Sequence, residues 1–190
     1  MGALDPACTA LGDILDAHTP TPGAEAADVA RIRAAVASGD PWSRTRPLHV
    51  TGSAIVVHPP TRRVLLRWHD RMGSWLQVGG HADAGETDPL AIARREAEEE
   101  TGLGDLVPWP DRVRPGLVHV VVVPVPASAT EPAHEHADLR FVLATARPDE
   151  VTPETATARL RWLAMPEAFD LVVEENLRTT LTRVAALLDT

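Results

Sequence analysis

The sequence predicts an α/β fold in which a mixed sheet lies between helices and a helical extension precedes the sheet. Short apolar stretches of strand length recur between residues 48 and 163, separated by turn residues such as Pro and Gly. Two segments, 88–102 and 171–188, instead have apolar residues at helical spacing. One helix between strands and another after the last strand are typical of a sheet that is covered on both faces.

Length, charge and cysteine content limit the class of protein. With 190 residues, the chain can bury one hydrophobic core and carry a small appendage. Its formal net charge of −9 argues against a nucleic-acid partner, which would require a basic surface. The single cysteine, Cys8, permits no internal disulfide and is typical of a reducing compartment. Because the sequence also has no signal-peptide pattern and no apolar stretch of membrane-spanning length, we expect a cytoplasmic protein with no membrane partner.

Residues 1–47 are expected to form a helical extension, followed by a main domain over residues 48–190. The apolar residues that predict two short amphipathic helices are Leu4, Leu11, Ile14 and Leu15, and then Val29, Ile32 and Val36. A linker of Thr, Pro and Gly, residues 19–23, separates the two helices. Either the helical pair packs on the main domain, or it serves as a lid over a ligand site or as an arm in a homodimer.

The main domain is expected to begin with strands. The strands predicted in its first half are residues 49–58, 63–68 and 75–78. Pro59-Pro60-Thr61-Arg62 predicts a hairpin turn between the first two strands. The third strand runs into Gly79-Gly80, where the backbone can approach a ligand closely. For Trp75 we favour packing in the core over stacking on a ligand.

Segment 88–102 carries helix signals at both ends. Asp88 can accept a hydrogen bond from the first free N–H groups, and Pro89 suits the first helical position. Gly102 can supply the left-handed residue that closes the helix. The expected inner stripe of the helix is Leu90, Ala93 and Ala97. Its small residues allow the helix to approach a sheet closely.

Three glutamates, Glu96, Glu99 and Glu100, share one face of this predicted helix, while Glu98 points away. Like charges at this spacing cost roughly a few tenths of a kcal/mol, and anions in the last turn oppose the helix dipole. A helix selected for stability alone would carry Lys or Arg there. Converging carboxylates are the ligands that a hard divalent cation such as Mg²⁺ requires, so we predict a metal site on this face.

The second half of the chain is expected to supply strands 117–125, 138–145 and 159–163 and a closing helix, 171–188. The first of these strands is almost continuously apolar, as in a strand that is buried on both faces. The loop after it, residues 126–137, contains His134-x-His136, whose alternate residues would share one face of a strand. A transition-metal pair, contact with a phosphate, and plain surface exposure are the three interpretations, and surface exposure is favoured because no third histidine ligand is identified.

Residues 80–103 resemble the Nudix box of the MutT-like hydrolases, Gly-x5-Glu-x7-Arg-Glu-U-x-Glu-Glu-x-Gly-U, in which U is a bulky aliphatic residue. Gly80 and Glu86 match the first half of this pattern. Segment 95–103, REAEEETGL, matches the second half.

The box departs from the family pattern in two places. Eight residues, not seven, separate Glu86 from Arg95, and Ala97 stands where a larger aliphatic residue is usual. Because Asp88-Pro89 fixes the helix start, we place the extra residue in the loop at Thr87-Asp88. The three-glutamate face is then preserved, whereas the usual pairing of Glu86 with Arg95 is expected to be disturbed.

The resemblance implies a Nudix-type α/β/α sandwich and a metal-dependent hydrolase. The enzyme would cleave a phosphoanhydride bond in a nucleoside diphosphate-linked compound or a nucleoside triphosphate, with Mg²⁺, or Mn²⁺ in its place. The implied metal ligands are the carbonyl of Gly80 and the carboxylates of Glu96, Glu99 and Glu100.

The catalytic residues implied by the resemblance are Glu96, Glu99 and Arg95. Glu99 would hold the metal or take a proton from water, and Arg95 would orient the glutamates. Because some family members place the base in a later loop, Glu131 and Glu135 are reserve candidates. The residues expected to face the negative charge of the substrate are Arg67, His81 and Arg140.

Two other functions are considered. A catalytically silent Nudix-like domain that binds a nucleotide or regulates a partner would be signalled by loss of a box glutamate, and none is lost. A diphosphate isomerase of the same fold uses a catalytic cysteine, and Cys8 lies outside the main domain. Subclass markers do not identify the substrate, because His119 stands where a proline would suggest ADP-ribose and the chain has no Tyr to suggest a dinucleoside polyphosphate.

Overall fold

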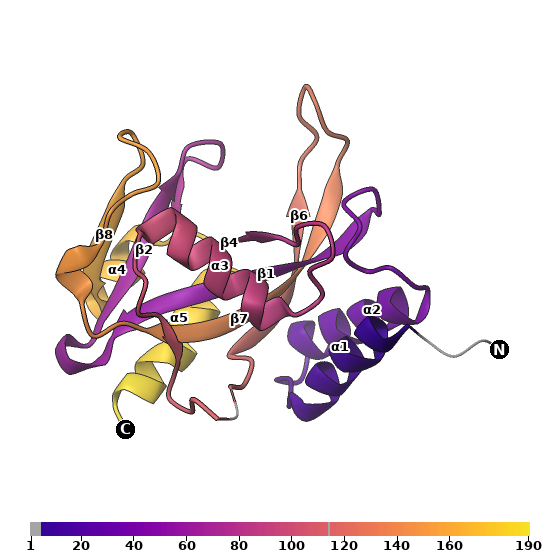
Figure 1. The fold of residues 1–190 in the computed structure, drawn as a ribbon, viewed down its shortest axis with the longest axis horizontal. Helices are drawn as coiled ribbons and strands as arrows, with labels where there is room; N and C mark the ends of the chain where they lie inside the picture. The colour runs from indigo at the N-terminus through magenta and orange to yellow at the C-terminus, as the bar shows by residue number, and fades with distance from the viewer. Residues whose placement is uncertain (1–4, 114) are drawn as a thin grey trace.

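A computed structural model describes residues 5–113 and 115–190, and it confirms the predicted fold, a mixed sheet with helices on both faces (Figure 1). At its centre, β1 (Leu48–His58) runs parallel to β7 (His134–Ala144), with residues 48–57 paired to 135–144. The remaining strands are β2 (Arg63–His69), β3 (Ser74–Leu76), β4 (Val78–His81), β5 (Val107–Pro108), β6 (His119–Val125) and β8 (Leu160–Ala164). β1 also pairs with β2 and β4, β7 with β5 and β6, and β2 with β3 and β8, all antiparallel.

Helix α3 (Pro89–Thr101) covers one face of the sheet and has the predicted ends. The side chain of Asp88 accepts a hydrogen bond from the N–H of Leu90 at 2.9 Å, and Gly102 ends the helix in a left-handed conformation at φ 68°. Ala93 and Ala97 of the predicted inner stripe are buried beneath the helix together with Ile92, whereas Leu90 is only partly buried. Gly52 of β1 makes this packing close, because a Cβ there would lie 2.4 Å from the carbonyl oxygen of Pro89.

Helices α4 (Met165–Leu171) and α5 (Glu175–Leu188) cover the opposite face (Figure 1). Leu177, Leu181 and Val184 of α5 are fully buried against Ile55 and Leu66 of the sheet. The apolar spacing that predicts the closing helix therefore corresponds to its packed face, although the helix begins at Glu175 and not at residue 171, which ends α4. No helix in the described part of the chain combines the length and apolarity that crossing a bilayer requires.

The N-terminal helices α1 (Pro6–Ala17) and α2 (Ala24–Ala37) pack on the sheet beside β6 (Figure 1). Leu11, Leu15 and Ile32 are fully buried and belong to the same apolar cluster as Ile92 beneath α3. The two helices therefore pack on the main domain, which is the first of the arrangements expected for the extension. Leu4, which the sequence assigns to the first helix, lies outside the described residues.

Helix α2 also covers the open edge of the sheet. β6 pairs only with β7 among the described strands, so every second N–H of β6 points away from the sheet. The carboxylate of Glu25 accepts a hydrogen bond from the N–H of Val120 at 3.1 Å, and Asp28 accepts one from Val122 at 2.9 Å. These contacts satisfy donors that an exposed edge strand would otherwise present to another chain.

Two predictions about the second half of the sheet need correction. Strand 117–125 is not buried on both faces: β6 is buried only through Val121, and its remainder extends with β7 as a projecting hairpin (Figure 1). The loop at residues 126–137 is shorter than predicted, because β7 already begins at His134. The polar run His134-Glu135-His136 gives no apolar strand signal, and it is extended because it pairs with the start of β1.

Candidate active site

A cleft of about 480 Å³ lies between the end of β4, helix α3 and the β6–β7 hairpin. Residues from strands β1, β2, β3, β4, β6 and β7 and from helices α3 and α5, together with turn residues, surround it; among those that matter for the site are Ser53, Gly80, His81, Glu96, His136 and Asp138. The cleft lies where the central pair β1 and β7 begins, so loops and strand ends supply polar groups to its wall. Such a hollow with convergent polar side chains is the first place to expect a ligand.

Glu96 and Glu100 are the box carboxylates that the fold draws inward. Burial raises the pKa of Glu96 despite the neighbouring Arg95, and burial raises the pKa of Glu100 to about 7 despite Arg67. Nη1 of Arg67 lies 2.9 Å from Oε1 of Glu100. The second carboxylate oxygen of Glu100 is buried and has no hydrogen-bond partner in the described part of the chain. An orphaned carboxylate oxygen on a desolvated pair of glutamates fits a divalent cation.

Gly80 lies directly against Glu96. A Cβ at Gly80 would lie 2.4 Å from the carboxylate carbon of Glu96 and 2.4 Å from its Oε1. Any larger residue would therefore displace this carboxylate. The predicted site residues Gly80, Glu96 and Glu100 are thus brought together by β4 and α3.

Arg95 organises this region through its guanidinium group. Its Nε and Nη2 donate to the two oxygens of Glu86, both at 2.9 Å, which makes a bidentate pair. Nη1 donates to Glu96 at 3.0 Å and to Glu99 at 3.1 Å, and Nη2 donates to the carbonyl of His81 at 2.8 Å. Hydrogen bonding to Glu86 raises the pKa of Arg95, and the same contact lowers the pKa of Glu86.

The predicted disturbance of the Glu86–Arg95 pair is therefore wrong. Helix α3 keeps the start fixed by Asp88, and the extra residue is accommodated in the loop before it. That loop folds back on itself, because the N–H of Asp83 donates to the Glu86 carboxylate at 2.8 Å. Glu86 is thereby positioned to reach Arg95 despite the longer spacing.

Glu99 and Glu98 lie outside the buried pair. The side chain of Glu99 is 54% exposed and contacts Arg95, so Glu99 stands at the rim of the site. Glu98 accepts a hydrogen bond from Nε of Arg94 at 2.7 Å, on the face that points away. The helical periodicity correctly separates Glu98 from the other three glutamates, but it does not reveal that Glu99 is much more exposed than Glu100.

The three residues expected to face substrate lie in different environments. Arg67 contacts Glu100 and Glu154, whereas His81 lines the cleft. Arg140 reaches the cleft but is only 2% exposed, and its N–H groups donate to Asp138, Asn176 and Thr180. Because these internal partners occupy the guanidinium, Arg140 holds the cleft wall together.

The two reserve bases are also separated by the fold. Glu131 lines the cleft, where its carboxylate lies 3.4 Å from Nη2 of Arg44 and 3.5 Å from Nη1 of Arg71. Glu135 instead forms an ion pair at 2.6 Å with Arg31 of α2, outside the cleft lining. Arg44 and Arg71 themselves line the cleft with half-exposed side chains, and no local sequence pattern marks either of them because each lies in a turn.

Sequence reasoning missed His49 and the grouping of the histidines, although it considered His81, His134 and His136 separately. His49, His81 and His136 lie together on the cleft side of the sheet, with His134 beside them. The third histidine that the sequence did not identify for His134-x-His136 is therefore present twice, in β1 and at the end of β4. Only the pairing of strands distant in sequence brings these residues together.

Comparison with known proteins gives a consistent result. A family model described as the NUDIX domain matches residues 48–184. A hydrolase of the NUDIX family from Clostridium perfringens is 22% identical, with 74% of this chain and 96% of that chain covered at a TM-score of 0.51. The dihydroneopterin triphosphate pyrophosphohydrolase of E. coli is 20% identical (76% and 97% covered, TM-score 0.54), and an Ap4A hydrolase of C. elegans is 17% identical (74% and 97%, TM-score 0.57). No curated protein matches the chain.

Proposed function

This chain belongs to the Nudix family, and from that premise we propose that it is a pyrophosphohydrolase that uses Mg²⁺ bound at Glu96 and Glu100. Its substrate is a nucleoside triphosphate or a compound linked through a nucleoside diphosphate. Nudix enzymes generally use divalent metals. The expected enzyme class, a Nudix pyrophosphohydrolase, is confirmed at the level of the family.

The observation that carries the proposal is the unpartnered oxygen of Glu100, one helical turn from the Glu96 carboxylate that lies against Gly80. Two desolvated carboxylates repel one another, and a cation between them removes both that repulsion and the unmet hydrogen-bonding need. When bound, Mg²⁺ neutralises the charge of a diphosphate and lowers the pKa of a coordinated water. Mn²⁺ is the alternative ion, because it accepts the same oxygen ligands.

Each residue around the pair has a distinct role in this proposal. Glu96 and Glu100 hold the cation, and Arg95 fixes Glu96 through the hydrogen bond at 3.0 Å. Glu99, which is exposed at the rim, is available to take a proton from water, and Glu131 across the cleft is the second candidate for that step.

Arg44 and Arg71 are our candidates for binding the phosphates. Both line the cleft and are loosely paired with Glu131, at 3.4 and 3.5 Å, and Nη2 of Arg71 also donates to the carbonyl of Pro126 at 2.9 Å. A guanidinium that is half exposed in a cleft can exchange a weak internal partner for a phosphate oxygen. Arg67 acts on the metal site through Glu100 and not on the substrate.

The similar solved structures are named for chemically different substrates, so the likeness to them does not select one substrate for this chain. The C. elegans relative is an Ap4A hydrolase, and the E. coli relative cleaves dihydroneopterin triphosphate. His119, the position of one subclass marker, is buried against Thr180 at 2.8 Å and does not line the cleft. Cytoplasmic localisation and dimerisation stay predictions.

One experiment tests the proposed function. The protein is incubated with Mg²⁺ in ¹⁸O-water and a panel of nucleoside triphosphates, sugar nucleotides, dinucleotides and non-nucleoside diphosphates, and the products are identified by mass. Label in a phosphate product names both the substrate and the phosphorus that water attacks. If a nucleotide binds in a metal-dependent way but is not turned over, the protein is a catalytically silent nucleotide-binding domain and not an enzyme.

A further inference from the structure

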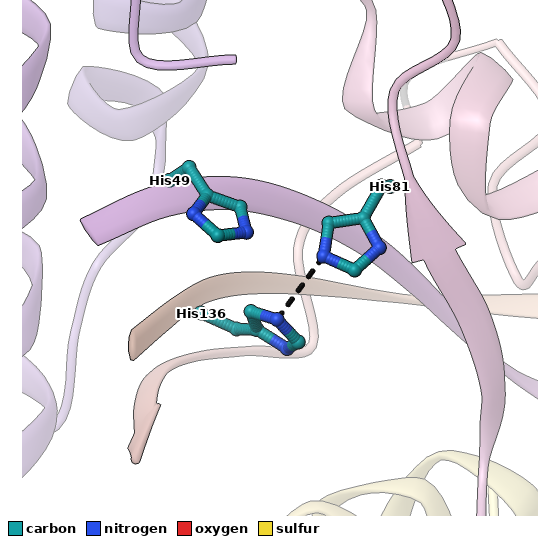
Figure 2. A group of neighbouring side chains, drawn as sticks. All are labelled: His49, His81 and His136. Carbon is teal, nitrogen blue, oxygen red and sulfur yellow. Dashed lines mark hydrogen bonds between the residues drawn. The ribbon is translucent and has the colours of Figure 1, made fainter. Parts of the chain in front are cut away.

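Four histidines gather at one end of the sheet, where His81, His134 and His136 line the cleft and His49 lies buried beside them. His49 lies near the start of β1, His81 ends β4, and His134 and His136 begin β7. Figure 2 shows His49, His81 and His136 with their rings turned toward one another from three strands. The ligand nitrogens of these three residues lie within 4.8 Å of one another. Strand pairing produces this arrangement, because His49 is the direct partner of His136 and Thr51, two residues on, is the partner of His81.

Backbone carbonyls fix the tautomers of two of these rings. Nδ1 of His49 lies 2.9 Å from the carbonyl oxygen of Arg46, and Nδ1 of His134 lies 3.0 Å from that of Pro132. A carbonyl oxygen only accepts, so each Nδ1 carries the proton and each neutral ring leaves a lone pair on Nε2. A hydrogen bond of this kind to the distal nitrogen is what normally orients a metal-binding histidine.

The lone pairs outnumber the protons available to them. Nε2 of His49 is buried, on a residue that is 2% exposed, and no group of the described chain pairs with it. Nε2 of His136 lies 3.1 Å from Nε2 of His81 and also 3.1 Å from Nε2 of His134. One N–H on His136 can serve only one of these neighbours. A buried nitrogen without a partner is costly, and a metal ion would satisfy it together with its neighbours.

The spacing and charge state of the rings suit metal coordination. Nitrogens bound tetrahedrally at about 2.0–2.1 Å from Zn²⁺ lie roughly 3.3 Å apart, close to the separations at His136. Burial is the main cause that lowers the pKa of His81 to about 4 and that of His136 to about 3, and it also lowers the pKa of His49. All three are therefore neutral ligands near pH 7. Among the charged groups that face them, Arg44 and Glu131 lie 3.4 Å apart as a pair of opposite sign, and Asp138 is paired with Arg140.

We propose that His49, His81 and His136 bind a transition-metal ion of the Zn²⁺ class, with His134 or water as the fourth ligand. Imidazole nitrogens select Zn²⁺, Co²⁺, Ni²⁺ or Cu²⁺, whereas Mg²⁺ prefers the oxygens of Glu96 and Glu100. The histidine site is therefore chemically distinct from the carboxylate site on α3, and the inference does not depend on the proposed hydrolase activity.

The site has a structural consequence for the cleft. The ion would join β1, β4 and β7 at the end of the sheet where the cleft opens. His81 directly follows Gly80, and its carbonyl accepts a hydrogen bond from Arg95. Metal at the histidines therefore fixes the segment that lies against Glu96.

Cobalt spectroscopy on the tag-free protein tests the proposal. After removal of metals with a chelator, Co²⁺ is titrated while visible d–d absorption and bound metal per chain are measured. We expect one equivalent to give absorption bands of nitrogen-ligated Co²⁺, and Zn²⁺ to displace it. His49→Gln and His136→Gln should each weaken Co²⁺ binding at least about 100-fold, because loss of even an outer-shell partner costs 10–100-fold.

Matched variants separate this site from the carboxylate site and from misfolding. The double variant Glu96→Gln, Glu100→Gln and the distant His58→Gln should both keep the Co²⁺ bands. His81→Gln, at the end of a strand, provides a third ligand variant should either buried histidine variant not fold, and melting in chelator establishes the fold of each. Unchanged bands in the ligand variants, or no nitrogen-ligated Co²⁺ in the wild type, would overturn the proposal.

Discussion

Gly80 approaches the carboxylate of Glu96 so closely that a single added methyl group would overlap it, at 2.4 Å from the carboxylate carbon. This glycine of β4 and the glutamate of α3 thus define one side of the proposed metal site. Because the neighbouring Arg95 also holds the Glu96 carboxylate, that carboxylate has little freedom to move aside. The first prediction follows from this contact.

Gly80→Ala should abolish Mg²⁺-dependent activity while the protein stays folded. The added Cβ displaces the Glu96 carboxylate and leaves the sheet intact, since Gly80 needs no positive φ. Gly104→Ala is the matched control, because no atom lies within 4 Å of a Cβ at that position. Turnover and circular dichroism of both variants would be compared. Wild-type turnover in Gly80→Ala would show that Glu96 is not held as described.

The second prediction concerns metal and stability. Glu96→Gln, Glu100→Gln should raise the melting temperature of the metal-free protein, because it removes two repelling, desolvated carboxylates. Mg²⁺ should stabilise the wild type by about 1.4 kcal/mol at ten times its Kd and should not stabilise the double variant. Thermal melting with and without Mg²⁺ measures both effects, with Glu98→Gln as the control. If Mg²⁺ stabilises the wild type and the double variant equally, the metal does not bind at these two glutamates of α3.

Arg95→Lys should lower kcat by roughly 100-fold, with a smaller change in KM. Lysine keeps the positive charge but cannot form the bidentate pair with Glu86 or reach Glu96 at the same time. Arg94→Lys is the control, since Arg94 pairs with Glu98 on the outward face. Steady-state kinetics on both variants test the assignment. Similar losses in the two variants would indicate a general effect of arginine on the helix.

Stability should depend on pH through Glu25. Burial alone would raise the pKa of this carboxyl, but hydrogen bonds from Arg183, Thr21, His18 and Val120 overcome it and hold the pKa well below its usual 4.5. A depressed pKa in the folded state contributes stability that is present above pH 4.5 and is lost as the pH falls below it. Glu25→Gln should therefore cost roughly 3 to 5 kcal/mol at pH 7, as expected when a buried ion pair loses one partner.

Chemical denaturation of wild type and Glu25→Gln at several pH values between 3 and 7 measures this dependence. The variant should show less loss of stability below pH 4.5, because its side chain does not titrate. Asp13→Asn, an exposed change on α1, serves as the control. Parallel curves for wild type and Glu25→Gln would show that Glu25 does not carry the acid sensitivity.

Removal of residues 1–45 should destabilise the domain and promote association. Leu11, Leu15 and Ile32 would leave an apolar surface uncovered, and the N–H groups of Val120 and Val122 would lose Glu25 and Asp28 as partners. An uncovered edge strand is a template for pairing with a second chain. Melting and light scattering of a chain that begins at Arg46 test this. If its melting temperature, mass and activity are unchanged, the extension is dispensable.

Local signals were sufficient for the parts of the fold that local chemistry determines. Asp88, Pro89 and Gly102 define α3 because a helix cap depends on neighbours a few residues away. The face shared by Glu96 and Glu100 follows from helical periodicity alone. The same holds for the apolar stripes of α1, α2 and α5, whose burial matches their spacing.

The start of β7, the partners of Arg140 and the histidine cluster depend on contacts between residues distant in sequence, so local patterns did not predict them. β7 begins at His134 because it pairs with β1, a strand about 90 residues earlier, and no local apolar alternation marks it. The guanidinium of Arg140 donates hydrogen bonds to Asp138 and also to Asn176 and Thr180 of α5. Whether Arg140 is free to bind a ligand therefore depends on where α5 packs. The cluster of His49, His81 and His136 has the same origin, since each residue comes from a different strand.

The central claim is that the Glu96 and Glu100 pair carries the metal-dependent hydrolysis. Its most direct measurement is the initial rate of Glu100→Gln beside that of Glu98→Gln, with saturating Mg²⁺ and the substrate that the panel identifies. Both changes remove one carboxylate from the same turn of α3, but only Glu100 has the buried, unpartnered oxygen. The account predicts a loss of at least about 100-fold for Glu100→Gln and a near wild-type rate for Glu98→Gln. A Glu100→Gln enzyme that turns over at the wild-type rate would contradict it.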